Sequence, residues 1–312
     1  MTRIGIIGTG DVAHVHIAEL LTGSNYEIVG CYSPENRQSM IIARQYRLIS
    51  YSSPEALFKY ADAVDITDNL PETMALAELS LKAMKHVFIA QPDRLSLEQM
   101  QYLKKLAEES GVVLQLGTGY RYCPAYEMLA ESMQAANVVV IWHQLVNRSD
   151  LFTRLNVELS YDFDFVTGIL KAGISKLDVK IWTKSENSPD VLHCRLECDN
   201  GCAVNLMVYT VAEGEPKLEF TFTSSDAVMR ADIFKSVVEK QYRTYNVADS
   251  IILDAYSDKT IHKRYLQNFY RAICNEHDAI RSIDEQFQNK AAADYIVNRI
   301  KQLQPAYQFI QY

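Results

Sequence analysis

Residues 4–13 read IGIIGTGDVA and place a glycine-rich turn directly between an apolar run and a helix-like pattern. The run at 4–7 predicts a buried strand, and the apolar spacing over 12–21 predicts a helix. Gly8 allows the tight turn, Gly10 lets the backbone approach a pyrophosphate, and Ala13 lets helix and strand pack closely. The helix N-terminus favours the phosphate charge. We therefore expect the turn to bind a dinucleotide through Gly8, Thr9, Gly10, Asp11 and Val12; a glycine-rich turn without a ligand is the alternative.

The rest of the N-terminal half alternates between strand-like and helix-like segments. Ser96 and Gln99 fit a capping box at the start of one of these helices. The apolar patterns predict strands at 27–32, 63–67, 87–90 and 112–116, and helices at about 34–46, 71–84 and 96–110. Repeated strand–helix units predict a doubly wound parallel sheet with helices on both faces, a Rossmann domain.

The pattern changes after about residue 122. Residues 191–198 alternate strictly between apolar and polar, and Asp199-Asn200-Gly201 predicts a hairpin turn into a partner strand at 202–209. Further strands are predicted at 138–145, 178–183 and 217–223, and two closing helices at about 262–274 and 284–303. The second half is thus expected to be an α+β domain on an open antiparallel sheet with one covered face.

Length and composition agree with two globular domains. At about 150 residues per domain, 312 residues predict two, here 1–121 for NAD(P) binding and 122–312 for substrate and oligomerisation. We expect the last helix to be able to pack back on the first domain. A net charge of -8 argues against a nucleic-acid partner, and no apolar run is long enough for a bilayer. No secretory leader is expected, and six scattered cysteines favour reduced thiols in a cytoplasm.

The end of the second predicted strand bears on the choice of cofactor. An acidic residue at that point would hydrogen-bond the ribose hydroxyl of NAD. The sequence has Tyr32-Ser33-Pro34 instead, with Arg37 close behind, and both Ser33 and Arg37 could hold a 2′-phosphate. This favours NADP over NAD. The alternatives stay open, because Glu35 could reach the same space and Arg37 could be a solvated helix residue.

Several stretches, in their order and spacing, resemble the Gfo/Idh/MocA family of glucose-fructose oxidoreductase and inositol dehydrogenase relatives. The resemblance covers nearly the whole chain. It is carried by GIIGTGDVAHVHIAEL (5–20, with His16), by KHV and AQP (85–87 and 90–92), by GTGYRYCPAY (117–126), by ECDNGCAVNL (197–206) and by YLQNFYRAI (265–273). The resemblance implies hydride transfer between a nicotinamide and a carbinol carbon, usually of a sugar or cyclitol.

The family's Glu-Lys-Pro motif, whose lysine can pass a proton, is changed in this chain. Its lysine position holds Gln91, and the preceding glutamate position holds Ala90. Because an amide does not titrate, Gln91 can only orient groups by hydrogen bonds. The resemblance further places Thr67, Asp68 and Asn69, Gln91 and Pro92, and Arg121 among the cofactor-binding residues.

The resemblance also implies an Asp and a His, four residues apart, on a helix of the second domain. If Asp164 matches the family's later structural Asp, Tyr161 takes the His position and Val157 the Asp position. A register two residues earlier puts Leu159 at the His position. In the first register Tyr161 becomes the expected proton donor and Gln91 the second catalytic residue. The alternative, which the residue type itself favours, is that Tyr161 packs on a half-buried helix face. Asp162, Asp164 and Lys171 are nearby candidates.

Cys194, Cys198 and Cys202, beside His193, raise the question of a metal site. Their spacing of four residues differs from the two-residue gap of a zinc knuckle, and free cysteine also packs as a small apolar residue. We expect no metal.

Two functions follow from these observations. The first is an NAD(P)-dependent oxidoreductase acting on a sugar-like small molecule, and the second is a catalytically silent sensor that binds the dinucleotide and a ligand. Loss of the lysine favours the silent protein, whereas the glycine-rich turn fits both. The resemblance also implies a homodimer or homotetramer. No G-x-S-x-G elbow or P-loop lysine supports a hydrolase or a kinase.

Overall fold

The computed structural model describes residues 1–117, 119–146, 151–182, 191–242, 248–252, 258–274 and 279–307. The chain forms two compact units. The first comprises Met1–Thr118 and Ser257–Phe287, and the second comprises Gly119–Tyr256 and Gln288–Tyr312. The predicted division after residue 121 lies close to the boundary at Gly119. Ser257–Phe287, which the sequence places in the second domain, groups with the first unit instead.

The first unit is built on a five-stranded sheet that is parallel throughout. Its strands are β1 (Thr2–Ile7), β2 (Tyr26–Tyr32), β3 (Ala63–Ile66), β4 (His86–Ile89) and β5 (Leu114–Leu116). Its helices are α1 (Asp11–Thr22), α2 (Asn36–Tyr46), α3 (Pro54–Phe58), α4 (Thr73–Lys82), α5 (Leu97–Ser110) and α8 (Asp258–Ile273), with the start of α9 (Ala279–Tyr307). The capping box of Ser96 and Gln99 is confirmed at the start of α5.

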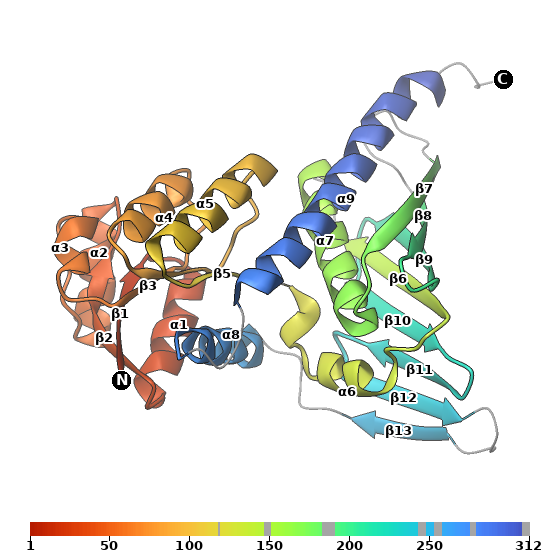
Figure 1. Ribbon diagram of the computed structural model, residues 1–312, viewed down its shortest axis with the longest axis horizontal. Helices are drawn as coiled ribbons and strands as arrows, with labels where there is room; N and C mark the ends of the chain where they lie inside the picture. Colours follow the sequence, from red (N-terminus) through yellow and green to blue (C-terminus); the bar gives the residue numbers. More distant parts are fainter. Residues whose placement is uncertain are drawn as a thin grey trace. The chain divides into compact units, whose positions relative to one another are not determined.

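The strand order β2-β1-β3-β4-β5 confirms the predicted doubly wound sheet (Figure 1). A single parallel bridge between Cys31 and Ser50 adds a one-residue strand outside β2. With that bridge counted, the sheet has the strand order of dinucleotide-binding folds, in which the order reverses beside the first strand. Ligands of such sheets bind at this reversal, outside the carboxyl ends of the strands.

Helix α8 joins the first unit through buried contacts that its amphipathic sequence does not identify. It lies beside α1 (Figure 1). The Tyr26 hydroxyl donates to the Leu266 carbonyl at 2.9 Å, and the rings of Phe88 and Phe269 lie 5.7 Å apart. These contacts explain why a helix near the end of the chain belongs to the N-terminal unit.

The second unit carries an eight-stranded sheet in the order β13-β12-β11-β10-β6-β9-β8-β7. Its strands are β6 (Val138–Val146), β7 (Ile174–Trp182), β8 (Val191–Cys198), β9 (Ala203–Val211), β10 (Lys217–Thr223), β11 (Ala227–Asp232), β12 (Val237–Tyr242) and β13 (Ala248–Ile252). Its helical segments are η1 (Tyr120–Tyr122), α6 (Pro124–Ser132), α7 (Leu151–Leu170) and the remainder of α9.

This sheet is mixed, whereas the alternating sequence pattern predicts an antiparallel one. Its central strands β6 and β9 run parallel, and all other neighbours are antiparallel. The reason is that α7 lies between β6 and β7 in the chain, and the β7–β8–β9 meander then leads back to β6. Strict alternation of apolar residues reports a half-buried strand but not the direction of its neighbour.

One face of the sheet is covered, as predicted. Burial alternates along β8 and β10, and the inward side chains pack with residues of α6, α7 and α9, which lie on one side of the sheet (Figure 1). The predicted hairpin between β8 and β9 is confirmed. In its turn Gly201 adopts a φ of 83°, and the Cys202 N–H donates to Oδ1 of Asn200 at 3.0 Å.

Candidate active site

The register of the parallel sheet gathers the predicted cofactor residues of the first unit at one edge. Ile7 pairs with both Tyr32 and Ile66, and Ile66 pairs with Ile89. The strands β1, β2, β3 and β4 therefore end side by side. The residues that follow them include Gly8, Ser33, Thr67 and Gln91.

The glycine-rich turn has the tight geometry that the sequence predicts. Gly8 adopts a φ of +133°, which disfavours any side chain, and its N–H donates to the Tyr32 carbonyl at 3.0 Å. A Cβ at Gly8 would overlap Oγ1 of Thr67 and come within 2.7 Å of Cγ of Asp68. The turn then runs into α1, whose first turn contains Asp11.

The backbone donors of this turn point at an anion. The N–H of Thr9 donates to Oδ2 of Asp68 at 2.6 Å, and the N–H of Gly10 lies 3.0 Å from Oδ1 and 3.1 Å from Oδ2. The Asp68 carboxylate thus accepts hydrogen bonds from the N–H groups that are expected to face a pyrophosphate. Its position shows that the turn can bind a negatively charged group. The residues present therefore fit the diphosphate of a dinucleotide.

The neighbours of Asp68 complete this part of the edge. Thr67 is fully buried and donates from Oγ1 to Oδ1 of Asp68 at 3.2 Å, while Oγ1 of Thr73 donates to the Asp68 carbonyl at 3.1 Å. Within the described part of the chain, Oδ1 of Asn69 is buried and has no hydrogen-bond partner. Such a group is satisfied when a ligand donor reaches it.

Ser33 and Arg37, the residues predicted to favour NADP, lie at the end of β2 and the start of α2. Ser33 is buried, and its hydroxyl accepts a hydrogen bond from the Glu35 N–H at 3.3 Å. Arg37 is exposed. An exposed guanidinium can turn toward a 2′-phosphate, but this role stays a prediction.

Gln91 and Pro92 follow β4 and are both half-buried. The preceding Ala90 is fixed by its N–H bond to the Ile66 carbonyl at 2.9 Å. Gly117 after β5 approaches so closely that a Cβ there would overlap the Ala90 carbonyl. The backbone before Gln91 is therefore held firmly.

Tyr161 and Arg121 lie in the second unit. The Tyr161 ring packs directly on Gly119, where a Cβ would overlap it, and lies edge-on to the ring of Tyr120 at 6.0 Å. Nη2 of Arg121 donates to Oδ1 of Asp164 at 2.8 Å and to its carbonyl at 3.1 Å. Arg121 thus anchors η1 to α7, and its role toward a cofactor stays a prediction.

Burial separates the two possible registers of α7. Leu159 is fully buried in the core, whereas Val157 and Tyr161 are only half-buried. A side chain that meets substrate cannot sit at the Leu159 position. Of the other candidates, Asp162 is completely buried and Lys171 is exposed at the end of α7 with a φ of 49°.

The second unit also contains a buried polar cluster that the sequence patterns do not predict. Nδ1 of His143 lies 2.8 Å from Oδ2 of Asp162, and its Nε2 lies 3.8 Å from Oε2 of Glu158. The Tyr120 hydroxyl donates to the same Glu158 oxygen at 2.8 Å. The available signal was His143 itself, a polar residue on the inward face of a strand, since its neighbours Val139, Ile141 and Leu145 are all buried.

The pKa values of this pair are shifted. Burial works to lower the pKa of His143, but the charge of Asp162 and its hydrogen bond outweigh burial and raise it. Burial also raises the pKa of Asp162, against the opposing effect of His143. Both shifts favour a proton on the pair in the folded protein.

The three cysteines of the β8–β9 hairpin are buried. Burial raises the pKa of Cys198 to about 12 and that of Cys202 to about 11, so both favour the thiol form. Thiolate, not thiol, binds metals. Across the residues that the structure describes, no group of three or more His, Cys, Asp or Glu side chains could hold a metal ion.

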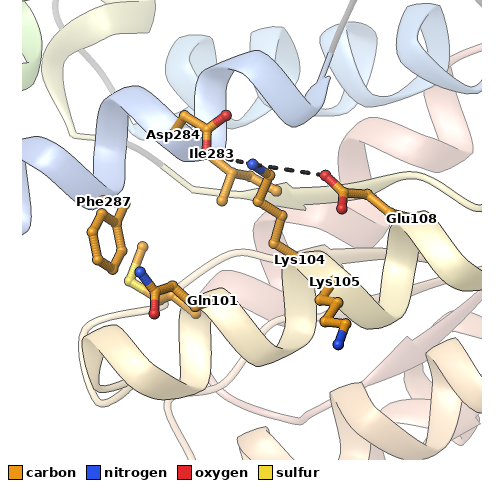
Figure 2. Close-up of a pocket in the computed structure, with 8 residues that line it drawn as sticks. Gln101, Lys104, Lys105, Glu108, Ile283, Asp284 and Phe287 are labelled. Carbon is orange, nitrogen blue, oxygen red and sulfur yellow. Dashed lines mark hydrogen bonds and ion pairs between the residues drawn. The ribbon is translucent and has the colours of Figure 1, made fainter.

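A separate cavity of about 230 Å³ opens between α5 and the first turns of α9 (Figure 2). Lys104 spans it to reach Oδ1 of Asp284 at 2.5 Å, and Ile283 and Phe287 form the α9 side. None of the predicted site residues lines it. Among the helices in the described ranges, none has the length and apolar composition needed to cross a membrane.

Comparison with known proteins bears on the first unit most directly. Residues 2–118 match the model of the Gfo/Idh/MocA family, an oxidoreductase family with an NAD-binding Rossmann fold. Glucose-6-phosphate 3-dehydrogenase of Bacillus subtilis is 29% identical over 125 residues, which are 39% of this chain and 35% of that enzyme. UDP-N-acetylglucosamine 3-dehydrogenase of Acidithiobacillus ferrooxidans is 28% identical over 130 residues, 42% of this chain and 41% of that enzyme. The matches thus span less than half of either relative.

The fold is similar over a much longer stretch. The solved structure of the Acidithiobacillus ferrooxidans enzyme aligns with a TM-score of 0.84 at 18% identity, covering 97% of this chain and 99% of that one. The two chains therefore share both the parallel and the mixed-sheet units.

Proposed function

We propose that this chain, whose residues 2–118 match the NAD-binding Rossmann domain of the Gfo/Idh/MocA oxidoreductases, is a nicotinamide-dependent oxidoreductase. Its substrate is a sugar-like molecule or small polyol, which reacts at a carbonyl or carbinol carbon. The single observation that carries the proposal is the glycine-rich turn, whose N–H groups from Thr9 and Gly10 converge on a carboxylate at the strand-order reversal. The names of the similar dehydrogenases support the substrate class.

The proposed cofactor site is the sheet edge in the first unit. The turn from Gly8 to Val12 holds the diphosphate, because its donors and the start of α1 favour negative charge. Ser33 and Arg37 face the adenosine ribose and give a preference for NADP. Residues 67–69 line the middle of the dinucleotide, with Oδ1 of Asn69 available as an acceptor. Gln91 and Pro92 face the nicotinamide, and Arg121 is a further proposed cofactor residue.

When bound, the nicotinamide supplies or accepts the hydride. In the direction of reduction the substrate oxygen gains a proton, and we assign Tyr161 as its donor. Packing against Gly119 and Tyr120 fixes the Tyr161 ring. Gln91 orients the reacting groups through its amide and cannot exchange a proton.

A second candidate is a silent binder of the dinucleotide and a ligand. It is favoured by the amide of Gln91 and the alkyl side chain of Val157, at positions where the resemblance implies titratable groups. Both candidates need the same cofactor site, so only turnover separates them.

The deciding experiment follows the loss of reduced nicotinamide absorbance with NADH and NADPH across a panel of keto-sugars and nucleotide-linked keto-sugars. The proposal predicts turnover with at least one substrate. It also predicts that Tyr161→Phe lowers kcat about 100-fold or more while cofactor affinity is unchanged. Tyr295→Phe, on an exposed ring of α9, is the matched control and keeps full activity.

Turnover that survives in Tyr161→Phe removes this residue from the chemistry. Saturable cofactor binding without any turnover, also in Gln91→Lys, favours the silent binder.

A further inference from the structure

The feature that goes beyond the proposed function is the position of the Asp68 side chain. A dinucleotide diphosphate and this carboxylate need the same donors, the N–H groups of Thr9 and Gly10. Each backbone N–H supplies one proton for hydrogen bonding. Hydrogen bonds to a carboxylate are among the stronger ones in proteins, so these donors are already satisfied without a ligand.

The carboxylate also fills the space over the turn. A Cβ built at Gly10 would lie 3.1 Å from Oδ1 of Asp68, and one at Gly8 would lie 2.7 Å from its Cγ. The close approach that glycine permits here is therefore used by the chain's own carboxylate. A diphosphate can reach the same donors only when this side chain moves away, and the two negative groups repel each other at short range.

We infer that Asp68 competes with the dinucleotide diphosphate for the N–H donors of the glycine-rich turn and thereby weakens cofactor binding. This inference rests on the proposed function. The movement required is local. Oγ1 of Thr73 holds the Asp68 carbonyl, whereas the carboxylate accepts hydrogen bonds from Oγ1 of Thr67 and from the N–H groups of Thr9 and Gly10. Rotation of one side chain is enough to free the donors.

The inference is tested by the dissociation constant of NADH, measured by fluorescence titration of the full chain. Asp68→Asn removes the charge at nearly unchanged size, and Asp68→Ala removes both charge and acceptor. We expect each to bind NADH about tenfold tighter or more than the unchanged protein. Glu72→Gln is the matched control, since Glu72 is an exposed acid four residues further on. Its affinity should equal that of the unchanged protein.

Inorganic pyrophosphate provides a second measurement that needs neither nicotinamide nor turnover. At equal concentration it should raise the Tm of Asp68→Ala more than that of the unchanged protein. Where Asp68→Asn does not fold, Asp68→Ala and Asp68→Ser carry the comparison.

Three results would overturn the inference. Equal NADH affinity in the unchanged protein and the Asp68 variants removes the competition and leaves the proposed function intact. If Glu72→Gln binds NADH as much more tightly as the Asp68 variants do, the gain is a general effect of removing negative charge. This result also leaves the proposed function intact. Absence of binding in every folded variant overturns the cofactor site itself, and the inference falls with it.

Discussion

Nδ1 of His143 and Oδ2 of Asp162 lie 2.8 Å apart in the interior of the second unit, joining the central strand β6 to helix α7. Removing one partner of a buried charged pair leaves the other charge buried and uncompensated. Asp162→Ala should lower the free energy of unfolding by about 3 kcal/mol at neutral pH. Urea unfolding measures this loss, with Asp226→Ala in an exposed turn as the control that changes stability by no more than about 0.5 kcal/mol.

The same pair has a pH signature. The pKa of His143 is raised in the folded protein, so its stabilising contribution is complete below the ordinary value of about 6.5 and is lost as the pH rises through the folded pKa. The raised pKa of Asp162 acts in the same direction. The stability difference between the unchanged protein and Asp162→Ala should therefore shrink as the pH rises above about 6.5. A difference that grows with pH would refute this assignment.

Gly8→Ala tests the turn itself. Gly8 has a φ of +133°, and a Cβ there would overlap Thr67. We therefore expect Gly8→Ala to lower the free energy of unfolding by about 1–3 kcal/mol and to abolish cofactor binding. Gly111→Ala is the control: Gly111 also has a positive φ, 66°, but a Cβ there meets no atom within 4 Å. Gly111→Ala should lower the free energy of unfolding by about 1 kcal/mol and leave NADH binding unchanged. Normal binding by Gly8→Ala would contradict the assignment of this turn.

His262 predicts the opposite pH dependence in the first unit. Nδ1 of this histidine lies 2.8 Å from Nε2 of the buried His16, whose Nδ1 is 2.6 Å from Oδ2 of Asp65. Burial, and then the charge of His16, lower the pKa of His262 to about 4. The unfolded chain therefore takes up this proton first, and stability falls as the pH drops from about 6.5 toward 4, by up to about 3 kcal/mol.

His262→Gln removes this titration and should flatten the acid side of the stability curve. Denaturant unfolding at several pH values measures it, and His193→Gln on β8 serves as the control. An acid limb that is identical in His262→Gln and in the unchanged protein would show that His262 does not titrate as expected.

The outer face of the mixed sheet carries two large exposed aromatic side chains, Trp142 at 46% and Trp182 at 53%. We propose that this face joins copies of the chain into a dimer or tetramer. Trp142→Lys should then shift the protein toward monomer in sedimentation experiments, whereas Tyr295→Lys, at an exposed position on α9, should not. A monomeric unchanged protein would contradict the proposed assembly.

Local sequence patterns identify most of the fold. Apolar runs and the turn at Gly8 predict the parallel sheet, and strict alternation predicts the β8–β9 hairpin. The parallel pairing of β6 with β9 is not predicted, because alternation is the same for either strand direction. The grouping of α8 with the first unit is also missed, because an amphipathic helix does not identify its partner.

In the candidate site, too, local features are predicted from the sequence and long-range contacts are not. Gly8 and Gly10 are recognised because the turn is contiguous in sequence. The contact of Asp68 with Thr9 spans 59 residues, and that of His143 with Asp162 spans 19, so both depend on strand order and helix packing. The alternation along 138–145 places His143 on the inward face of its strand, but it does not identify Asp162 as the partner, and no local pattern identifies the contact of Asp68 with Thr9.

The most direct test of the central claim is a fluorescence titration of the unchanged protein, Asp68→Ala and Gly8→Ala with NADH and NADPH, extended to about 1 mM cofactor. We predict saturable binding to the unchanged protein, tighter binding to Asp68→Ala, and none to Gly8→Ala. Absence of saturable binding to both the unchanged protein and Asp68→Ala would contradict a nicotinamide site at this turn.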